Sequence, residues 1–105
     1  MFQLRIYTLR SAEALDRYAA IHWASHIGSL EAVGVETRGI WTSRDGDENR
    51  LFALVSYKNG ADPARVETEY MAGSAFAEDM AGFDPDDIVD VTSVLLDATA
   101  SSPIR

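Results

Sequence analysis

Six segments of regular hydrophobic patterning follow one another along this chain in the order strand, helix, strand, strand, helix, strand. Apolar and polar residues alternate over residues 2–9 (FQLRIYTL), a period that is typical of a strand. β-Branched and aromatic residues fill 35–43 and 50–58, and the Asp-Gly turn within 44–49 predicts that these two strands form a hairpin. Residues 88–97 (IVDVTSVLLD) form the fourth predicted strand.

The first predicted helix covers residues 12–33 and contains both histidines of the chain. Ser11 has a side chain preferred at an N-cap, and Gly34 supplies a stop at the other end. At about 100° per residue, His22 and His26 lie near the centre of the apolar face of this helix. The apolar residues predicted to share that face are Leu15, Ala19, Leu30 and Val33.

The second helical region begins at Asp62 and Pro63, an N-cap followed by proline at the first helical position. It covers 63–72. Ser74 follows an interrupting glycine, and we expect it to cap a second short helix over AFAEDMA at 75–81.

The element order β-α-β-β-α-β predicts a ferredoxin-like α+β fold, in which one four-stranded antiparallel sheet carries both helices on one face. The chain of 105 residues suits one domain, with residues 1–98 forming the fold and 99–105 a C-terminal tail. The opposite sheet face is left bare, yet it is predicted to carry apolar residues, namely Phe52, Leu54, Val94 and Leu96. We therefore expect two copies to pack sheet against sheet as a homodimeric, closed barrel.

Composition narrows the class of partner. The formal net charge of −8 argues against nucleic acid and anionic membrane surfaces, since both reward clustered Lys and Arg. No apolar run approaches the roughly 20 residues that span a bilayer. The chain has no cysteine and its N-terminus does not resemble a signal peptide, so a cytoplasmic location is expected.

The two histidines are the leading candidates for a functional site. Buried imidazoles need partners for their ring nitrogens, and a neutral imidazole suits proton abstraction near pH 7. We assign His26 as a general base on a pocket wall, flanked by Trp23, with His22 in support. The alternative is that both are core histidines satisfied by Ser, Tyr or backbone groups.

Two arginines are candidate anchors for an anionic group. Arg5 shares a strand face with Tyr7, and Arg38 shares another with Thr42. Either arginine is able to bind a carboxylate or an enolate if its face lines a cavity. The alternative, favoured because arginines are mostly exposed, is an ion pair at the surface or at an interface with one of the many Asp and Glu residues.

Aromatic and thioether side chains are candidates for the lining of a cavity. The alternative is that they are plain core, which is their more frequent role. The phenols of Tyr7, Tyr57 and Tyr70 have the chemistry to stabilise developing negative charge. The residues assigned to substrate contact through their bulk are Trp23, Trp41, Tyr70, Phe76 and Met80.

No cofactor or metal is expected. His22 and His26 share a helical face, but no third ligand is evident, and the residue after the first histidine is Trp23 instead of the metalloprotease Glu. The acidic residues of 84–87 (DPDD), together with Glu78 and Asp79, lack the ligand spacing of a calcium loop and are interpreted as a solvated turn. Neither a phosphate loop nor a dinucleotide fingerprint is present.

The chain resembles the NIPSNAP family of the dimeric α/β-barrel superfamily. The resemblance is carried by LRIYTLR at the start, HWASHIGSLEAVGVETRGIWT, YMAGSAFAEDMAGFD, and the late LLD and SSP, which together span nearly the whole sequence. It implies a homodimer with a small-molecule cavity between helices and sheet in each subunit. Relatives in the superfamily include cofactor-independent monooxygenases, isomerases, polyketide cyclases and decarboxylases, while others have no assigned activity. Trp23 with His26 is also similar to a pattern on the first helix of EthD-like proteins.

These patterns favour a protein that binds a hydrophobic small molecule and performs cofactor-free acid–base chemistry on a carbonyl or phenolic compound. Cyclisation, isomerisation and oxygenation by molecular oxygen all belong to this class. The alternative is a non-catalytic dimeric module for binding or interaction. An open cavity with unpaired polar groups would favour the first interpretation, and a filled core with saturated histidines the second.

Overall fold

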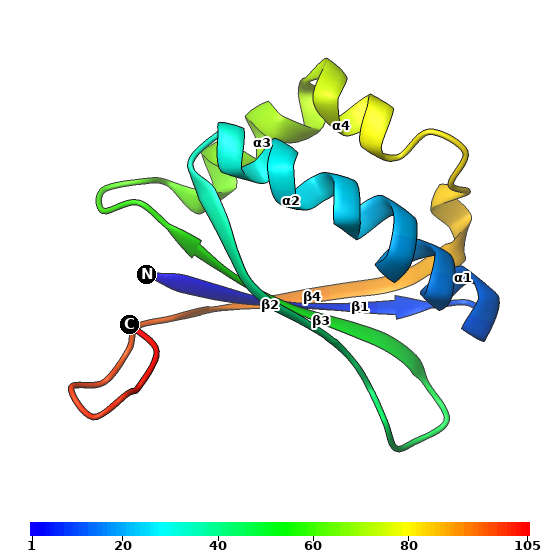
Figure 1. Ribbon diagram of the computed structural model, residues 1–105, viewed down its shortest axis with the longest axis horizontal. Coiled ribbons are helices and arrows are strands. Elements are labelled where there is room, and N and C mark those ends of the chain that lie inside the picture. Colours follow the sequence, from blue (N-terminus) through cyan, green and yellow to red (C-terminus); the bar gives the residue numbers. More distant parts are fainter.

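The computed structural model describes residues 1–105 as one sheet covered on one face by a layer of helices (Figure 1). The strands are β1 (Phe2–Leu9), β2 (Val35–Thr42), β3 (Asn49–Tyr57) and β4 (Ile88–Leu96). The helical segments are α1 (Ala12–Arg17), η1 (Tyr18–His22), α2 (Trp23–Ala32), α3 (Pro63–Ala72), α4 (Ser74–Asp79) and η2 (Pro85–Asp87). The strand order is β2-β3-β1-β4, and every neighbouring pair is antiparallel. The predicted ferredoxin-like fold is confirmed.

Most of the predicted helix ends are present. The Ser11 side chain accepts a hydrogen bond from an N–H of the first turn of α1, and Asp62 does the same for α3. Gly34 lies just beyond α2 with φ of +87°, a conformation that favours glycine. The prediction that Ser74 caps α4 is wrong, because Gly73 adopts the extended backbone of the N-cap and Ser74 is already helical.

The first helix is not one regular α-helix. Its middle segment, η1, is a π-helical turn in which the N–H of Trp23 donates to the carbonyl of Tyr18, five residues earlier. The wider turn brings both of these residues onto the buried face, which a wheel of 100° per residue does not predict. The wheel also placed Val33 on that face, but α2 ends at Ala32 and Val33 is exposed.

The central strand β1 turns its polar side toward the helices. Gln3, Arg5 and Tyr7 are buried under the helical layer, whereas Leu4 and Ile6 face the uncovered side of the sheet. This reverses the usual pattern of a sheet with one solvated face. The inner side of β1 therefore supplies the polar groups of the site described below.

The outer sheet face is the surface opposite the helices, and it is broadly apolar. Trp41 lies on it with 53% of its surface exposed, and its ring covers Gly39 so closely that any side chain there would collide with it. The same face is continued by Leu4, Ile6, Phe52, Leu54, Val94 and Leu96.

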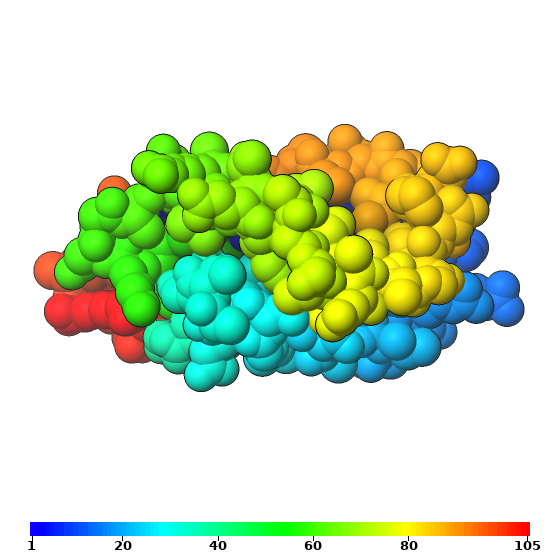
Figure 2. Space-filling view, turned by 90° about the horizontal axis from the view of Figure 1, so that it is seen from above, coloured from blue at the N-terminus to red at the C-terminus, as the bar shows by residue number.

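The helices also leave β4 uncovered, because β4 (orange) lies beside α3 and α4 in Figure 2. The predicted two-sided apolar character of the sheet is confirmed.

Candidate active site

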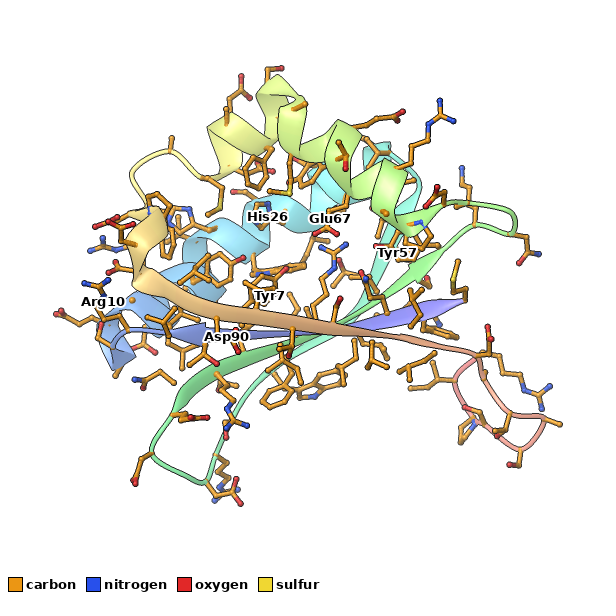
Figure 3. All side chains as sticks on the ribbon, turned by 180° about the vertical axis from the view of Figure 1, so that it is seen from behind. Tyr7, Arg10, His26, Tyr57, Glu67 and Asp90 are labelled. Carbon is orange, nitrogen blue, oxygen red and sulfur yellow. The ribbon has the colours of Figure 1, made fainter.

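A cavity of about 300 Å³ lies between the helical layer and the sheet. Its wall is mostly apolar and is contributed by β1, η1, α2, α3, α4 and β4. Seven of the residues singled out from the sequence line it: Arg5, Tyr7, Trp23, His26, Tyr70, Phe76 and Met80. Figure 3 shows His26 and Glu67 reaching into the space between the helices and Tyr7 on the sheet. A concave, mostly apolar space with a few converging polar groups is the usual form of a small-molecule site.

His26, Tyr70 and Asp79 form a hydrogen-bonded triad across three helices. Nδ1 of His26 lies 2.7 Å from the Tyr70 hydroxyl and 3.3 Å from Oδ2 of Asp79. The Tyr70 hydroxyl lies 2.7 Å from the same carboxylate oxygen. The imidazole is stacked on Phe76 and meets Trp23 edge-on, with ring centroids 5.9 and 5.3 Å apart respectively, so its plane is fixed.

The triad determines which nitrogen of His26 carries the proton. An ionised carboxylate only accepts, so the single hydroxyl hydrogen of Tyr70 goes to Asp79. Nδ1 of His26 must then be the donor toward the Tyr70 oxygen and Asp79. In the neutral ring this leaves an unprotonated Nε2, which makes no hydrogen bond with the protein.

The Nε2 atom of His26 is open to the cavity. Only three buried polar side-chain atoms lack a partner, namely Nε2 of His22, Nε1 of Trp23 and Oγ1 of Thr37. Nε2 of His26 also has no partner, but it is not one of these three enclosed atoms. It therefore retains some accessible surface, although the residue as a whole is only 4% exposed. A lone pair on an orientated imidazole at a cavity wall is the arrangement that a general base requires.

Burial and hydrogen bonding shift the pKa values of the triad. Burial lowers the pKa of His26, and the bond to Asp79 only partly offsets it, so the neutral base is favoured. Burial acts to raise the pKa of Asp79, but hydrogen bonds from Tyr70, Ser29 and His26 outweigh it and leave that pKa below its usual value. Burial, followed by the hydrogen bond to Asp79 and then the Asp79 charge, raises the pKa of Tyr70, which keeps the phenol protonated.

His22 holds Asp79 from the other side. Its Nδ1 lies 2.8 Å from the backbone carbonyl of Asp79 at the end of α4, so in this contact Nδ1 is the donor. The ring packs edge-on against Phe83 and does not line the cavity. Both predicted histidines therefore converge on Asp79, one through its backbone and one through its carboxylate.

Arg5 is at the centre of a second buried network, within the sheet. Its Nε donates to Oε1 of Gln3 and its Nη2 donates to the Tyr57 hydroxyl, both at 2.8 Å. The Tyr57 hydroxyl donates to the same Gln3 oxygen, also at 2.8 Å. The expectation of a surface or interface ion pair is wrong for Arg5, because the residue is 6% exposed and no carboxylate pairs with it.

Two further tyrosines present hydroxyls to the cavity. Tyr7 and Tyr18 both line it, and their rings meet edge-on at 5.3 Å. The Tyr7 hydroxyl lies beside Arg5 and Tyr18, and the Tyr18 hydroxyl lies beside Trp23. Burial raises the pKa of both phenols, so both remain hydrogen-bond donors at neutral pH.

Four of the predicted site residues lie away from the cavity wall. His22 and Tyr57 stand behind it and hold Asp79 and Arg5. Arg38 is exposed beside Glu36, 3.6 Å from its carboxylate, because a register shift between Thr37 and Gly39 interrupts the alternation that paired Arg38 with Thr42. Trp41 lies on the outer sheet face.

Sequence reasoning missed Asp79, Tyr18 and Glu67 as parts of the site. Asp79 was grouped with the exposed acids of 84–87, although its side chain is only 11% exposed. Tyr18 is brought to the wall by the π-helical turn. No group of three or more His, Cys, Asp or Glu side chains is arranged to hold a metal ion, and no helix is long and apolar enough to cross a membrane.

Several solved structures share this fold. An uncharacterized NIPSNAP domain protein from Burkholderia xenovorans superposes with a TM-score of 0.72 at 20% identity, covering 97% of each chain. A NIPSNAP family protein with unknown function from Agrobacterium tumefaciens gives 0.80 at 18% identity, covering 99% of this chain and 92% of that one. A dimeric ferredoxin-like protein from an uncultured marine organism gives 0.55 at 14% identity, covering 94% and 98%.

At these identities the structures support the fold alone, and no curated protein matches the chain. The NIPSNAP family model, by contrast, matches residues 2–103, nearly the whole sequence. The chain therefore belongs to the NIPSNAP family.

Proposed function

We propose that this protein binds a hydrophobic carbonyl or phenolic compound in its cavity and performs cofactor-independent acid–base chemistry on it, with His26 as the general base. The observation that carries this proposal is the asymmetry of the His26 ring. Nδ1 is held by Tyr70 and Asp79, whereas Nε2 faces the cavity without a partner. The same base–orienter arrangement is used by enzymes that remove a proton from a bound substrate.

The proposed step is proton removal from a carbon next to the substrate carbonyl. The proton passes to Nε2 of His26, and the carboxylate of Asp79 stabilises the imidazolium that forms. The electron pair of the broken C–H bond moves onto the carbonyl oxygen as an enolate. Hydroxyls from Tyr7 and Tyr18 and the Arg5 guanidinium are available to stabilise that oxygen. Return of the proton to another atom would complete an isomerisation, and attack by the carbanion would give a cyclisation.

The other predicted site residues have supporting roles in this proposal. Trp23, Phe76 and Met80 form apolar walls for the substrate body. His22 and Tyr57 are positioning residues, since they contact Asp79 and Arg5 but not the cavity.

The competing function is a non-catalytic binding or interaction module. Such a module would have a filled core and saturated imidazoles. The open cavity, with the unpartnered Nε2 of His26 and free N–H groups of Arg5 on its wall, favours the catalytic proposal.

We also propose that a second copy of the chain covers the outer sheet face. That face carries apolar side chains on all four strands, and an exposed apolar surface of this kind marks an association site. The similar fold from the marine organism is described as dimeric. Sedimentation should give twice the chain mass, and Leu54→Asp should give the monomer. A wild-type monomer at micromolar concentration would refute this part.

Deuterium exchange tests the catalytic proposal without knowledge of the natural substrate. The α-protons of 1-phenylpropan-2-one and acetophenone exchange slowly in neutral D₂O, and wild-type protein should accelerate this exchange. His26→Gln should abolish the acceleration while the protein remains folded, as judged by a cooperative urea transition. Arg38→Gln, on the far exposed surface, is the matched control and should behave as wild type. No acceleration by the wild-type protein, or full acceleration by His26→Gln, would refute the assignment.

A further inference from the structure

Arg5 carries an uncompensated charge. It is 6% exposed, it makes no ion pair, and its partners Gln3 and Tyr57 are neutral. Burying an isolated charge is costly, and buried charges in proteins are normally paired or bound to an ion. The sheet therefore holds a cation in place without supplying its counter-ion.

The free part of the guanidinium faces the cavity. A guanidinium has five N–H groups, and Gln3, Tyr57 and the neighbouring Tyr7 hydroxyl take at most three of them, which leaves at least two. Apart from the neighbouring Tyr7, Arg5 has no further hydrogen-bond partner, and Arg5 lines the cavity, so the remaining N–H groups face it. One N–H from each terminal nitrogen suffices for an end-on, two-point contact with a carboxylate.

The other acidic groups do not neutralise Arg5. The Asp79 carboxylate is engaged by Tyr70 and His26. Glu67, on α3, lines the cavity and is half-buried, but it makes neither an ion pair nor a hydrogen bond (Figure 3). Glu67 therefore adds a negative charge to the wall without pairing with the guanidinium, and it disfavours an anion bound at Arg5.

We propose that the cavity binds a small organic monocarboxylate, with its carboxylate on Arg5 and its apolar body against Trp23 and Phe76. This inference rests on the proposed function, because it names the substrate class of the same cavity. The cavity volume of about 300 Å³ is at the lower end of the range for small-molecule sites, which limits the ligand to a compact body. Benzoate, with one ring and one carboxylate, fits this description.

Benzoate and benzamide form a matched pair of probes, since they differ in charge but hardly in shape. In NMR titrations at pH 7 and low salt, wild-type protein should bind benzoate at least about tenfold more tightly than benzamide. Arg5→Gln should bring the two affinities together, whereas Arg50→Gln, outside the cavity, should leave the ratio unchanged. Equal affinities in the wild-type protein would overturn the proposal.

Glu67→Gln is a second variant with the opposite expected effect. Glu67 is half-buried and unpaired, so its replacement should leave the fold intact even if Arg5→Gln does not fold. Benzoate should bind about threefold or more tightly to this variant, because a like charge is removed, while benzamide should be unaffected. Weaker benzoate binding would contradict a cationic anchor in this cavity.

The experiments separate this proposal from the function on which it rests. His26-dependent exchange on neutral ketones, together with equal binding of benzoate and benzamide, would retain the acid–base function and refute the carboxylate. Failure of both probes to bind at millimolar concentration, together with absence of exchange, would refute both.

Discussion

The two buried polar networks of this protein have the same plan with opposite charge. In each, a tyrosine hydroxyl links a charged side chain to a neutral one: Tyr57 links Arg5 to Gln3, and Tyr70 links Asp79 to His26. The cationic network lies on the adjacent strands β1 and β3, whereas the anionic network joins three separate helices. The positive charge of Arg5 is therefore held by the sheet on one side of the cavity, whereas the negative charge of Asp79 is held by three helices on the other side.

The difference lies in what supports each charge. Gln3 and Arg5 belong to a central strand whose backbone is bonded on both sides, so their positions are fixed by the whole sheet. Asp79 is the last residue of a six-residue helix, and His22, His26 and Tyr70 hold it there. We therefore expect changes in the sheet network to affect mainly stability, and changes in the helical network to affect mainly the chemistry of His26.

The largest expected effect is on stability, from Gln3→Leu. This change removes the single oxygen that accepts from both Arg5 and Tyr57, so a buried cation loses support. The free energy of unfolding should fall by about 3 kcal/mol. Urea denaturation of Gln3→Leu, Arg5→Met and the double variant measures the coupling. The double variant should recover much of the loss, and simple additivity would contradict the network.

Asp79→Asn should affect mainly the rate. Asparagine keeps the shape but loses the charge that stabilises a protonated His26, so the deuterium exchange rate should fall about 100-fold. Stability should change by only about 1 kcal/mol. Glu78→Gln, the exposed neighbouring acid, should leave both quantities unchanged. A rate loss of equal size in Glu78→Gln would show that overall charge, not the triad, is responsible.

The two tyrosines allow the most direct comparison. Tyr57→Phe should lower the free energy of unfolding by about 2 kcal/mol, because Arg5 loses a buried partner. Tyr70→Phe should lower it by about 1 kcal/mol, because Nδ1 of His26 is already 3.3 Å from Asp79 and donates to it directly. The exchange rate should drop about tenfold in Tyr70→Phe alone. A larger loss of stability in Tyr70→Phe together with a larger loss of rate in Tyr57→Phe would contradict the comparison.

The smallest effect is on the pH dependence of stability. Burial lowers the folded-state pKa of His26 below its ordinary value of 6.5, so the unfolded chain binds a proton first as the pH falls. The free energy of unfolding should therefore decrease once the pH drops below about 6.5. Asp79, with its lowered pKa, adds a second loss at more acidic pH. Between pH 7 and pH 5.5, the urea midpoint should fall less in His26→Gln than in the wild-type protein. An equal fall in both proteins would show that His26 is not the source of the pH dependence.

The fold was largely predictable, because its elements are defined by local signals. Alternation over 2–9, the Ser11 and Asp62 caps and the Asp-Gly turn all occur where the structure has the corresponding features. The π-helical turn was not predictable, since a wheel assumes one constant period along the helix. The register shift near Gly39 was not predictable either, since the strand pattern assumes strict alternation of side chains along the strand.

The site was predictable only in part. His26 was found because two histidines on an apolar helix face are unusual. Asp79 lies 53 residues away and beside exposed acids, so no local pattern separated it from them. Arg5 is a candidate anchor in the sequence, but the general behaviour of arginine favours an ion pair at the surface or at an interface, and only the packing of the helices shows which face of its strand is buried. Long-range packing, which decides both cases, is not encoded in local spacing.

The π-helical turn also has a consequence for how the chain tolerates length changes. Because a π-helical turn holds one residue more than an α-helical turn, deleting one residue within η1 would restore an ordinary helix, and the residues on either side would keep their faces. Inserting one residue between Trp23 and His26, in the regular helix α2, would instead rotate His26 by about 100° about the helix axis and out of the cavity. That insertion should remove the proposed base, whereas deletion of Ile21, which is exposed within η1, should retain it.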